Sequence, residues 1–148
     1  MNTNFDIRHF GIVVKNLDES LLFYKDLLKF TVFKEMDESG EEISNFLGIK
    51  NVKVKTIKMK NMSGQMIELL HYDNNDLYDN TIKINQIGPT HLALSVCDLD
   101  SIYHTFLSRG IKFISAPQIT ADKFAKVAFC IAPEGTFIEL VQELKVNH

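Results

Sequence analysis

The chain has 148 residues, of which 45% are hydrophobic and 24% are charged, and its formal net charge is -3. This length and balance predict one ordinary globular domain with a single main core. Its lysines are scattered among acidic residues, which argues against nucleic acid or an anionic membrane as the main partner, so we expect a small-molecule partner. No apolar stretch approaches the roughly 20 residues of a membrane span, and the polar start does not resemble a signal peptide, so we expect a cytoplasmic location.

The first predicted element is a strand that begins near residue 8. Phe10, Ile12 and Val14 alternate along it and fall on one face, and His9 falls on the other face. A helix follows, with Asn16 or Asp18 as its cap. Its apolar stripe has helical spacing and consists of Leu17, Leu21, Tyr24 and Leu28. Lys29 follows this helix as a weak stop signal.

Strands are predicted next at residues 30–35 and 52–60. The segment between them, residues 35–51, carries Ile43, Phe46 and Leu47 at helical spacing. It predicts either a short amphipathic helix that lines or covers the site, or a loop that packs on the edge of the sheet.

The strand "GQMIELLHY" at residues 64–72 places a carboxylate inside an apolar run. Ile67 and Leu69 share the face that should meet a helix, so Glu68 must point the opposite way. His71 lies on the face of Ile67 and Leu69, and we expect it to be a packing or surface residue. The polar, turn-rich stretch that follows, residues 73–88, is predicted to be a linker.

The second half of the chain repeats the first. Residues 90–117 align with residues 8–35, and His91 falls on His9 at an offset of 91 - 9 = 82. Glu139, in "GTFIELVQ", falls on Glu68 at an offset of 139 - 68 = 71, so the first copy is longer by 82 - 71 = 11 residues. The second helix is predicted to begin at a cap, Asp98, and to end at Gly110. Its apolar stripe consists of Leu99, Ile102 and Phe106.

This repeat predicts an α+β protein made of two βαβββ modules that form a cupped mixed sheet with helices outside. We expect module one at about residues 5–72 and module two at about residues 89–144 of a single domain. The two cysteines, Cys97 and Cys130, are too few and too far apart for a disulfide framework or a cysteine-based zinc site, and we expect both to pack in the core.

Four side chains are predicted to project from the inner face of such a sheet: His9, Glu68, His91 and Glu139. A lone buried carboxylate is costly, so each glutamate needs a partner. Imidazole and carboxylate ligands suit zinc, nickel, cobalt, manganese or iron. Four protein ligands leave two octahedral positions open, as catalysis requires. The sequence therefore predicts a divalent metal site.

The sequence resembles the vicinal oxygen chelate superfamily, which includes glyoxalase I, methylmalonyl-CoA epimerase, extradiol dioxygenases, fosfomycin-modifying enzymes and bleomycin-binding proteins. The stretches that carry the resemblance are "HFGIVVKNLDESLLFYKDLL", "HLALSVCDLDS" and "FCIAPEGTFIEL". Ala132 stands where the family usually has an aspartate. The resemblance implies paired modules and metal ligands at the positions of His9, Glu68, His91 and Glu139, a pattern similar to that of glyoxalase I.

The resemblance implies a metal-dependent lyase or isomerase of glyoxalase type that acts on a small hydroxy-carbonyl compound or thioester. In the implied mechanism the metal stabilises an enediolate, and Glu139 and Glu68 are the candidate bases. The positions that help glyoxalase I recognise glutathione hold Val13 and Tyr72 here, which argues against a glutathione substrate. The alternatives are a ring-cleaving dioxygenase and a non-catalytic binding or resistance protein. The family also leads us to expect a homodimer.

Overall fold

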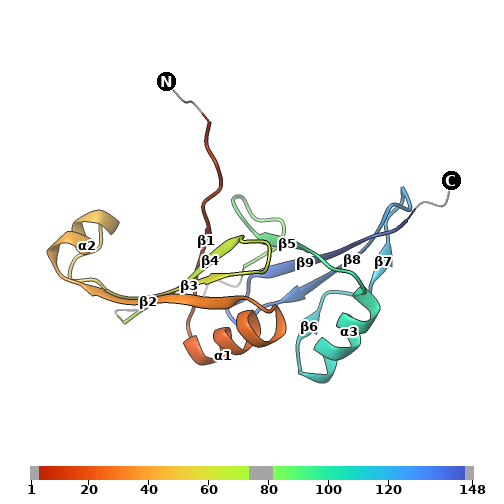
Figure 1. Cartoon of the computed structure of the whole chain (residues 1–148), viewed down its shortest axis with the longest axis horizontal. Coiled ribbons are helices and arrows are strands. Elements are labelled where there is room, and N and C mark those ends of the chain that lie inside the picture. The colour runs from red at the N-terminus through yellow and green to blue at the C-terminus, as the bar shows by residue number, and fades with distance from the viewer. Residues whose placement is uncertain (1–3, 74–81, 146–148) are drawn as a thin grey trace. The chain divides into compact units, whose positions relative to one another are not determined.

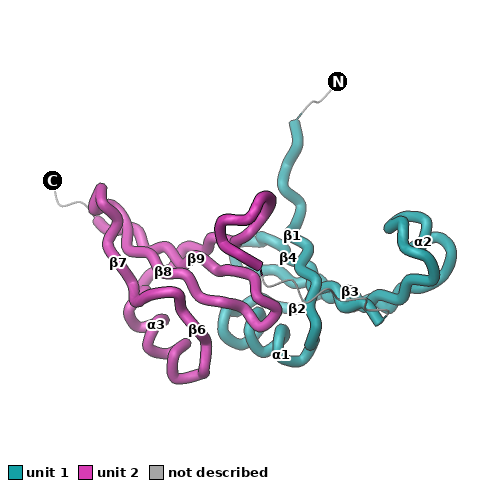
Figure 2. The backbone as a smooth tube through the Cα atoms, turned by 180° about the vertical axis from the view of Figure 1, so that it is seen from behind, with its two compact units in different colours: residues 1–78 teal, residues 79–148 magenta. Residues whose placement is uncertain are grey.

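The computed structural model describes residues 4–73 and 82–145. It divides the chain into two units, residues 1–78 and residues 79–148 (Figure 2). Each unit contains its own mixed sheet and a helix that follows the first strand.

The sheet of the first unit has four strands in the order β1-β4-β3-β2 (Figure 1). β1 and β4 are parallel, and the other neighbours are antiparallel. Ile57, Met59 and Leu69 are at most 1% exposed and form part of the core. The strands are β1 (Phe10–Val13), β2 (Thr31–Ser39), β3 (Lys53–Lys60) and β4 (Met66–Tyr72).

The first helix changes its geometry halfway. It begins as α1 (Leu17–Leu21), whose cap Asn16 accepts a hydrogen bond from the backbone N–H of Glu19 at 3.1 Å. It continues as a π-helical turn, η1 (Leu22–Leu27). The wider turn buries both Phe23 and Tyr24, which are 1% and 0% exposed. The expected stripe included Tyr24 but missed Phe23, because 3.6-residue spacing does not hold through a π turn.

The segment expected to be a helix or an edge loop forms a helix, α2 (Glu41–Leu47). None of its residues is buried, and Phe46 is 82% exposed. The helix packs on β2 and lies at the far end of the β2–β3 ribbon (Figure 1). β2 is the strand farthest from β1 in this sheet.

The strands of the second unit have the same order as those of the first, except that one strand is divided into two. Its sheet has the order β5-β9-β8-β6, and β7 also pairs with β8. The βαβββ pattern predicts one strand directly after the second helix, at residues 111–117, but the structure has two short strands, β6 and β7, that pair with different parts of β8. The strands are β5 (His91–Ser95), β6 (Lys112–Phe113), β7 (Gln118–Ile119), β8 (Ala125–Ile131) and β9 (Phe137–Glu143).

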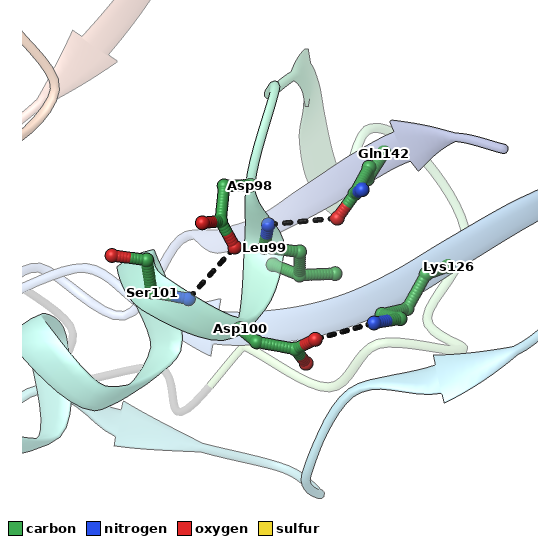
Figure 3. A network of polar contacts seen from close by, with 6 residues as sticks. All are labelled: Asp98, Leu99, Asp100, Ser101, Lys126 and Gln142. Carbon is green, nitrogen blue, oxygen red and sulfur yellow. Dashed lines mark hydrogen bonds and ion pairs between the residues drawn. The ribbon is translucent and has the colours of Figure 1, made fainter.

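Helix α3 (Leu99–Ser108) is fixed to its sheet by polar contacts at its first turn (Figure 3). The predicted cap Asp98 accepts a hydrogen bond from Ser101 N at 3.0 Å, and Gln142 Oε1 on β9 accepts one from the helix's first N–H at 2.9 Å. Asp100 forms an ion pair with Lys126 of β8. The two hydrogen bonds satisfy backbone donors at the helix start that have no partner within the helix, and the ion pair links the helix to β8.

The predicted α+β class with two βαβββ-type modules is confirmed. Of the cysteines, Cys130 is buried as expected, but Cys97 is exposed, so its expected place in the core is wrong. It lies between β5 and the cap of α3, where the chain turns at the surface. Within residues 4–73 and 82–145, no helix is both long and apolar enough to cross a membrane.

Candidate metal centre

The first histidine and the first glutamate meet through the register of two parallel strands. Gly11 of β1 lies opposite Glu68 of β4, so His9, two residues before Gly11, points to the same face of the sheet as Glu68. His9 Nε2 is 3.2 Å from Glu68 Oε2. Neither side chain is fully exposed, with 31% of His9 and 13% of Glu68 accessible.

The second unit builds the same pair with the same register. Ala93 of β5 lies opposite Glu139 of β9, and His91 again precedes that position by two residues. His91 Nε2 is 3.5 Å from Glu139 Oε2. The His–Glu pair is thus a feature of both modules and does not depend on how the units are placed.

The donor chemistry and spacing of each pair fit a divalent ion. Two ligands about 2.1 Å from one ion and at right angles to each other lie about 3 Å apart. The His–Glu distances of 3.2 and 3.5 Å are close to that spacing. Within each unit the structure brings together two candidate ligands, and no third His, Cys, Asp or Glu side chain joins either pair among the described residues.

The two pairs differ in the neighbour on the adjacent strand. Lys58 of β3 lies opposite Glu68, and its Nζ is 3.2 Å from Glu68 Oε1. Phe129 of β8 lies opposite Glu139, and its ring stacks edge-to-face with His91 at a centroid distance of 5.6 Å. One glutamate therefore contacts an ammonium group, whereas the other lies beside an aromatic ring.

Sequence reasoning missed Lys58, although a signal for it exists. Lys58 and Phe129 each precede the glutamate of their own copy by ten residues, since 68 - 58 = 10 and 139 - 129 = 10. If the two copies are aligned at their glutamates, Lys58 of the first copy corresponds to Phe129 of the second.

His71 is placed away from the pair, on the helix side of the sheet. Its Nδ1 is 3.2 Å from the carbonyl oxygen of Val14, and it lines a small hollow together with residues 15–19 at the start of α1. Alternation along β4 puts it on the face of Ile67 and Leu69. The structure thus agrees with a packing or surface role.

Comparisons with known proteins agree with this architecture. Residues 8–130 match the family described as the glyoxalase/bleomycin resistance protein/dioxygenase superfamily. A protein from Synechocystis, named a probable lactoylglutathione lyase, is 33% identical over 135 residues, which cover 90% of this chain and 92% of the relative.

Solved structures share the fold at low sequence identity. A glyoxalase family protein from Bacillus cereus superposes with a TM-score of 0.85 at 20% identity, covering 98% of this chain and 99% of that one. The trypanothione-dependent glyoxalase I of Leishmania major gives a TM-score of 0.68 at 20% identity, covering 95% of this chain and 88% of that one.

Paired βαβββ modules with the vicinal oxygen chelate fold define the class of this protein. The chain belongs to the glyoxalase/bleomycin resistance protein/dioxygenase superfamily. An enzyme of this superfamily acts on a small molecule, and members of the family generally use a divalent metal ion.

Proposed function

We propose that this protein is a divalent-metal-dependent lyase or isomerase of glyoxalase type. Its substrate is a small hydroxy-carbonyl compound or thioester. The metal ligands are His9, Glu68, His91 and Glu139, drawn from one chain or from two chains of a homodimer. The observation that carries the proposal is the repeated pair: in both units a histidine and a glutamate meet at 3.2 to 3.5 Å through the same strand register.

When bound, a divalent ion would polarise two neighbouring substrate oxygens and lower the pKa of the adjacent C–H group. One of the two carboxylates, Glu139 or Glu68, would then remove the proton, and the other would return it. Glu139 is the stronger candidate for the base, because it lies beside the Phe129 ring and contacts only an imidazole in the pairings described above. Glu68 also contacts Lys58, which holds one of its two oxygens.

The substrate we propose is not a glutathione adduct, although the Synechocystis relative is named a probable lactoylglutathione lyase. Val13 and Tyr72 occupy the positions where glyoxalase I carries an arginine and an asparagine that contact glutathione. Val13 is 48% exposed and has no polar atom in its side chain. A valine cannot pair with a glutathione carboxylate, which an arginine binds with two parallel hydrogen bonds.

One contact favours a second candidate, a ring-cleaving dioxygenase. If Glu68 stays paired with Lys58 and does not bind the metal, the remaining ligands are His9, His91 and Glu139. Two histidines and one carboxylate are the facial triad of ferrous oxygenases, which leaves three metal positions for substrate and dioxygen.

The two candidates are separated by metal and oxygen dependence. Purified untagged protein is stripped of metal and reloaded with zinc or with ferrous iron. It is then assayed under argon for isomerisation of a thiohemiacetal formed from a thiol other than glutathione, and in air for catechol cleavage. We expect isomerisation with zinc under argon, and a loss of orders of magnitude in Glu139→Gln. Activity that requires both iron and air would favour the dioxygenase. If the protein binds metal but neither reaction occurs, the remaining candidate is a binding protein.

A further inference from the structure

Lys58 places a positive charge within the first module's half of the proposed metal centre. Its ammonium group is 3.2 Å from Glu68 Oε1, while the other oxygen of Glu68 is 3.2 Å from His9. Lys58 is 26% exposed and Glu68 is 13% exposed, so water screens this contact only in part. Phe129 stands at the matching position in the second unit, so no second lysine repeats this arrangement there.

The formal charges of the site depend on this lysine. A divalent ion and two carboxylates sum to zero, and Lys58 raises the total to +1. The total is the same whether Glu68 binds the ion or stays with Lys58, because both groups remain beside the site in either case. A half-buried site with one uncompensated positive charge favours a ligand that supplies one negative charge.

We propose that Lys58 is a positioning residue that makes the site selective for a monoanionic oxygen chelate. Two sources supply that chemistry: a substrate whose carboxylate is one of the two chelating oxygens, such as a 2-hydroxy acid, and a neutral hydroxy-carbonyl compound that becomes anionic during proton transfer. This inference rests on the proposed metal centre, and it adds the charge of the ligand that the centre selects.

The experiment uses the full chain loaded with cobalt(II), whose visible absorption changes when oxygen ligands bind. Three probes are titrated. Glycolate is a 2-hydroxy acid, hydroxyacetone is its neutral near-isostere, and acetohydroxamate resembles the anionic form of a reacting hydroxy-carbonyl compound. Each dissociation constant is measured for the wild type and for Lys58→Met, which keeps an unbranched side chain of nearly the same length and removes its charge.

We expect Lys58→Met to weaken glycolate or acetohydroxamate binding by about tenfold and to leave hydroxyacetone binding nearly unchanged, as for the loss of one charge-assisted interaction. Lys58→Arg should restore the preference for the anion, which a merely structural role would not require. The matched control is Lys55→Met on the opposite face of β3, where Lys55 pairs with Glu35 and Asp37. It removes the same charge and should leave all three dissociation constants unchanged.

The probes separate the two sources. If Lys58→Met weakens glycolate binding, the preferred ligand is a carboxylate substrate. If Lys58→Met weakens acetohydroxamate binding alone, Lys58 favours the negative charge that develops during the reaction. Equal effects of Lys58→Met on charged and neutral probes, or an equal effect of Lys55→Met, would overturn the proposal. Cobalt binding is measured first. If the protein binds no cobalt, the proposed metal centre is wrong, and the proposed function is refuted together with this inference.

Discussion

At the scale of single residues, the two cysteines show how strongly surroundings control reactivity. Cys130 is fully buried on β8, and burial raises the pKa of its thiol to about 12, because the apolar interior disfavours the thiolate. Cys97 is exposed. The thiolate is the reactive form of cysteine, so the two positions should respond differently to a thiol reagent.

We expect the native protein at pH 8 to react with one equivalent of Ellman's reagent, at Cys97. Cys130 should react only after the protein is unfolded in guanidinium, because at pH 8 it is both inaccessible and protonated. Absorbance of the released thiolate gives the count. Cys97→Ser is the control, and a full equivalent from this variant in its native state would contradict the assigned burial.

A second residue-level prediction concerns the histidines. His9→Ala or His91→Ala should weaken metal binding by more than about tenfold, since each removes a proposed ligand. His71→Ala should leave metal affinity unchanged, because His71 lies beside the Val14 carbonyl on the helix side of β4. Metal content after dialysis and cobalt titration measure both. Metal loss in His71→Ala with retention in His9→Ala would reverse the assigned faces.

At the scale of elements, the first helix contains one residue more than the second. From the cap Asn16 to the left-handed residue Lys29 there are 29 - 16 = 13 steps, and from Asp98 to Gly110 there are 110 - 98 = 12. The π-helical turn η1 accommodates the additional residue. Both helices therefore end in a left-handed residue, with φ of 63° at Lys29 and 79° at Gly110.

The backbone at Lys29 should therefore be strained, and glycine at this position should relieve the strain. A side chain in the left-handed region costs about 1 kcal/mol, and glycine avoids this cost. We expect Lys29→Gly to raise the free energy of unfolding by up to about 1 kcal/mol. The control is Lys25→Gly, an exposed position within η1, which should lower it by about 1 kcal/mol. Urea denaturation followed by circular dichroism compares them, and destabilisation by both variants would contradict the strain at Lys29.

Prediction from sequence succeeded for elements wherever periodicity and caps agree. Asp98, the stripe of α3 and the end at Gly110 were all predicted from local patterns, and the structure has them. The π turn was not predicted, because the expected stripe assumed 3.6-residue spacing, whereas the wider turn buries the adjacent residues Phe23 and Tyr24. The split of the expected strand into β6 and β7 was also missed, since both depend on pairing with β8.

At the scale of the whole molecule, the repeat carried most of what the sequence could predict. It matched His9 with His91 and Glu68 with Glu139, and the structure forms a close His–Glu pair within each unit. The contact between Lys58 and Glu68 depends on the pairing of two strands, which the repeat does not specify. That all four ligands bind one ion remains a prediction.

Exposed apolar side chains lead us to expect that the chain assembles. Several large apolar side chains are exposed on the single chain, including Phe33 at 45%, Phe46 at 82% and Phe124 at 56%. Exposed apolar surface favours association. We expect a homodimer of twice the 16.9 kDa chain mass in light scattering at micromolar concentration. A monomer under these conditions would contradict the prediction.

A dimer also allows a test of which units share a metal ion. His9→Ala and His91→Ala chains with different tags are co-expressed, and the mixed dimer is isolated by both tags. If each ion binds to the first unit of one chain and the second unit of its partner, the mixed dimer retains one site with all four ligands and should recover about half the wild-type metal content. If each chain builds its own site, every site lacks a histidine and none recovers. The control dimer, His9→Ala with Glu68→Gln, has both changes in first units and should not recover in either arrangement, so recovery specific to the first mixture assigns the ligands to two chains.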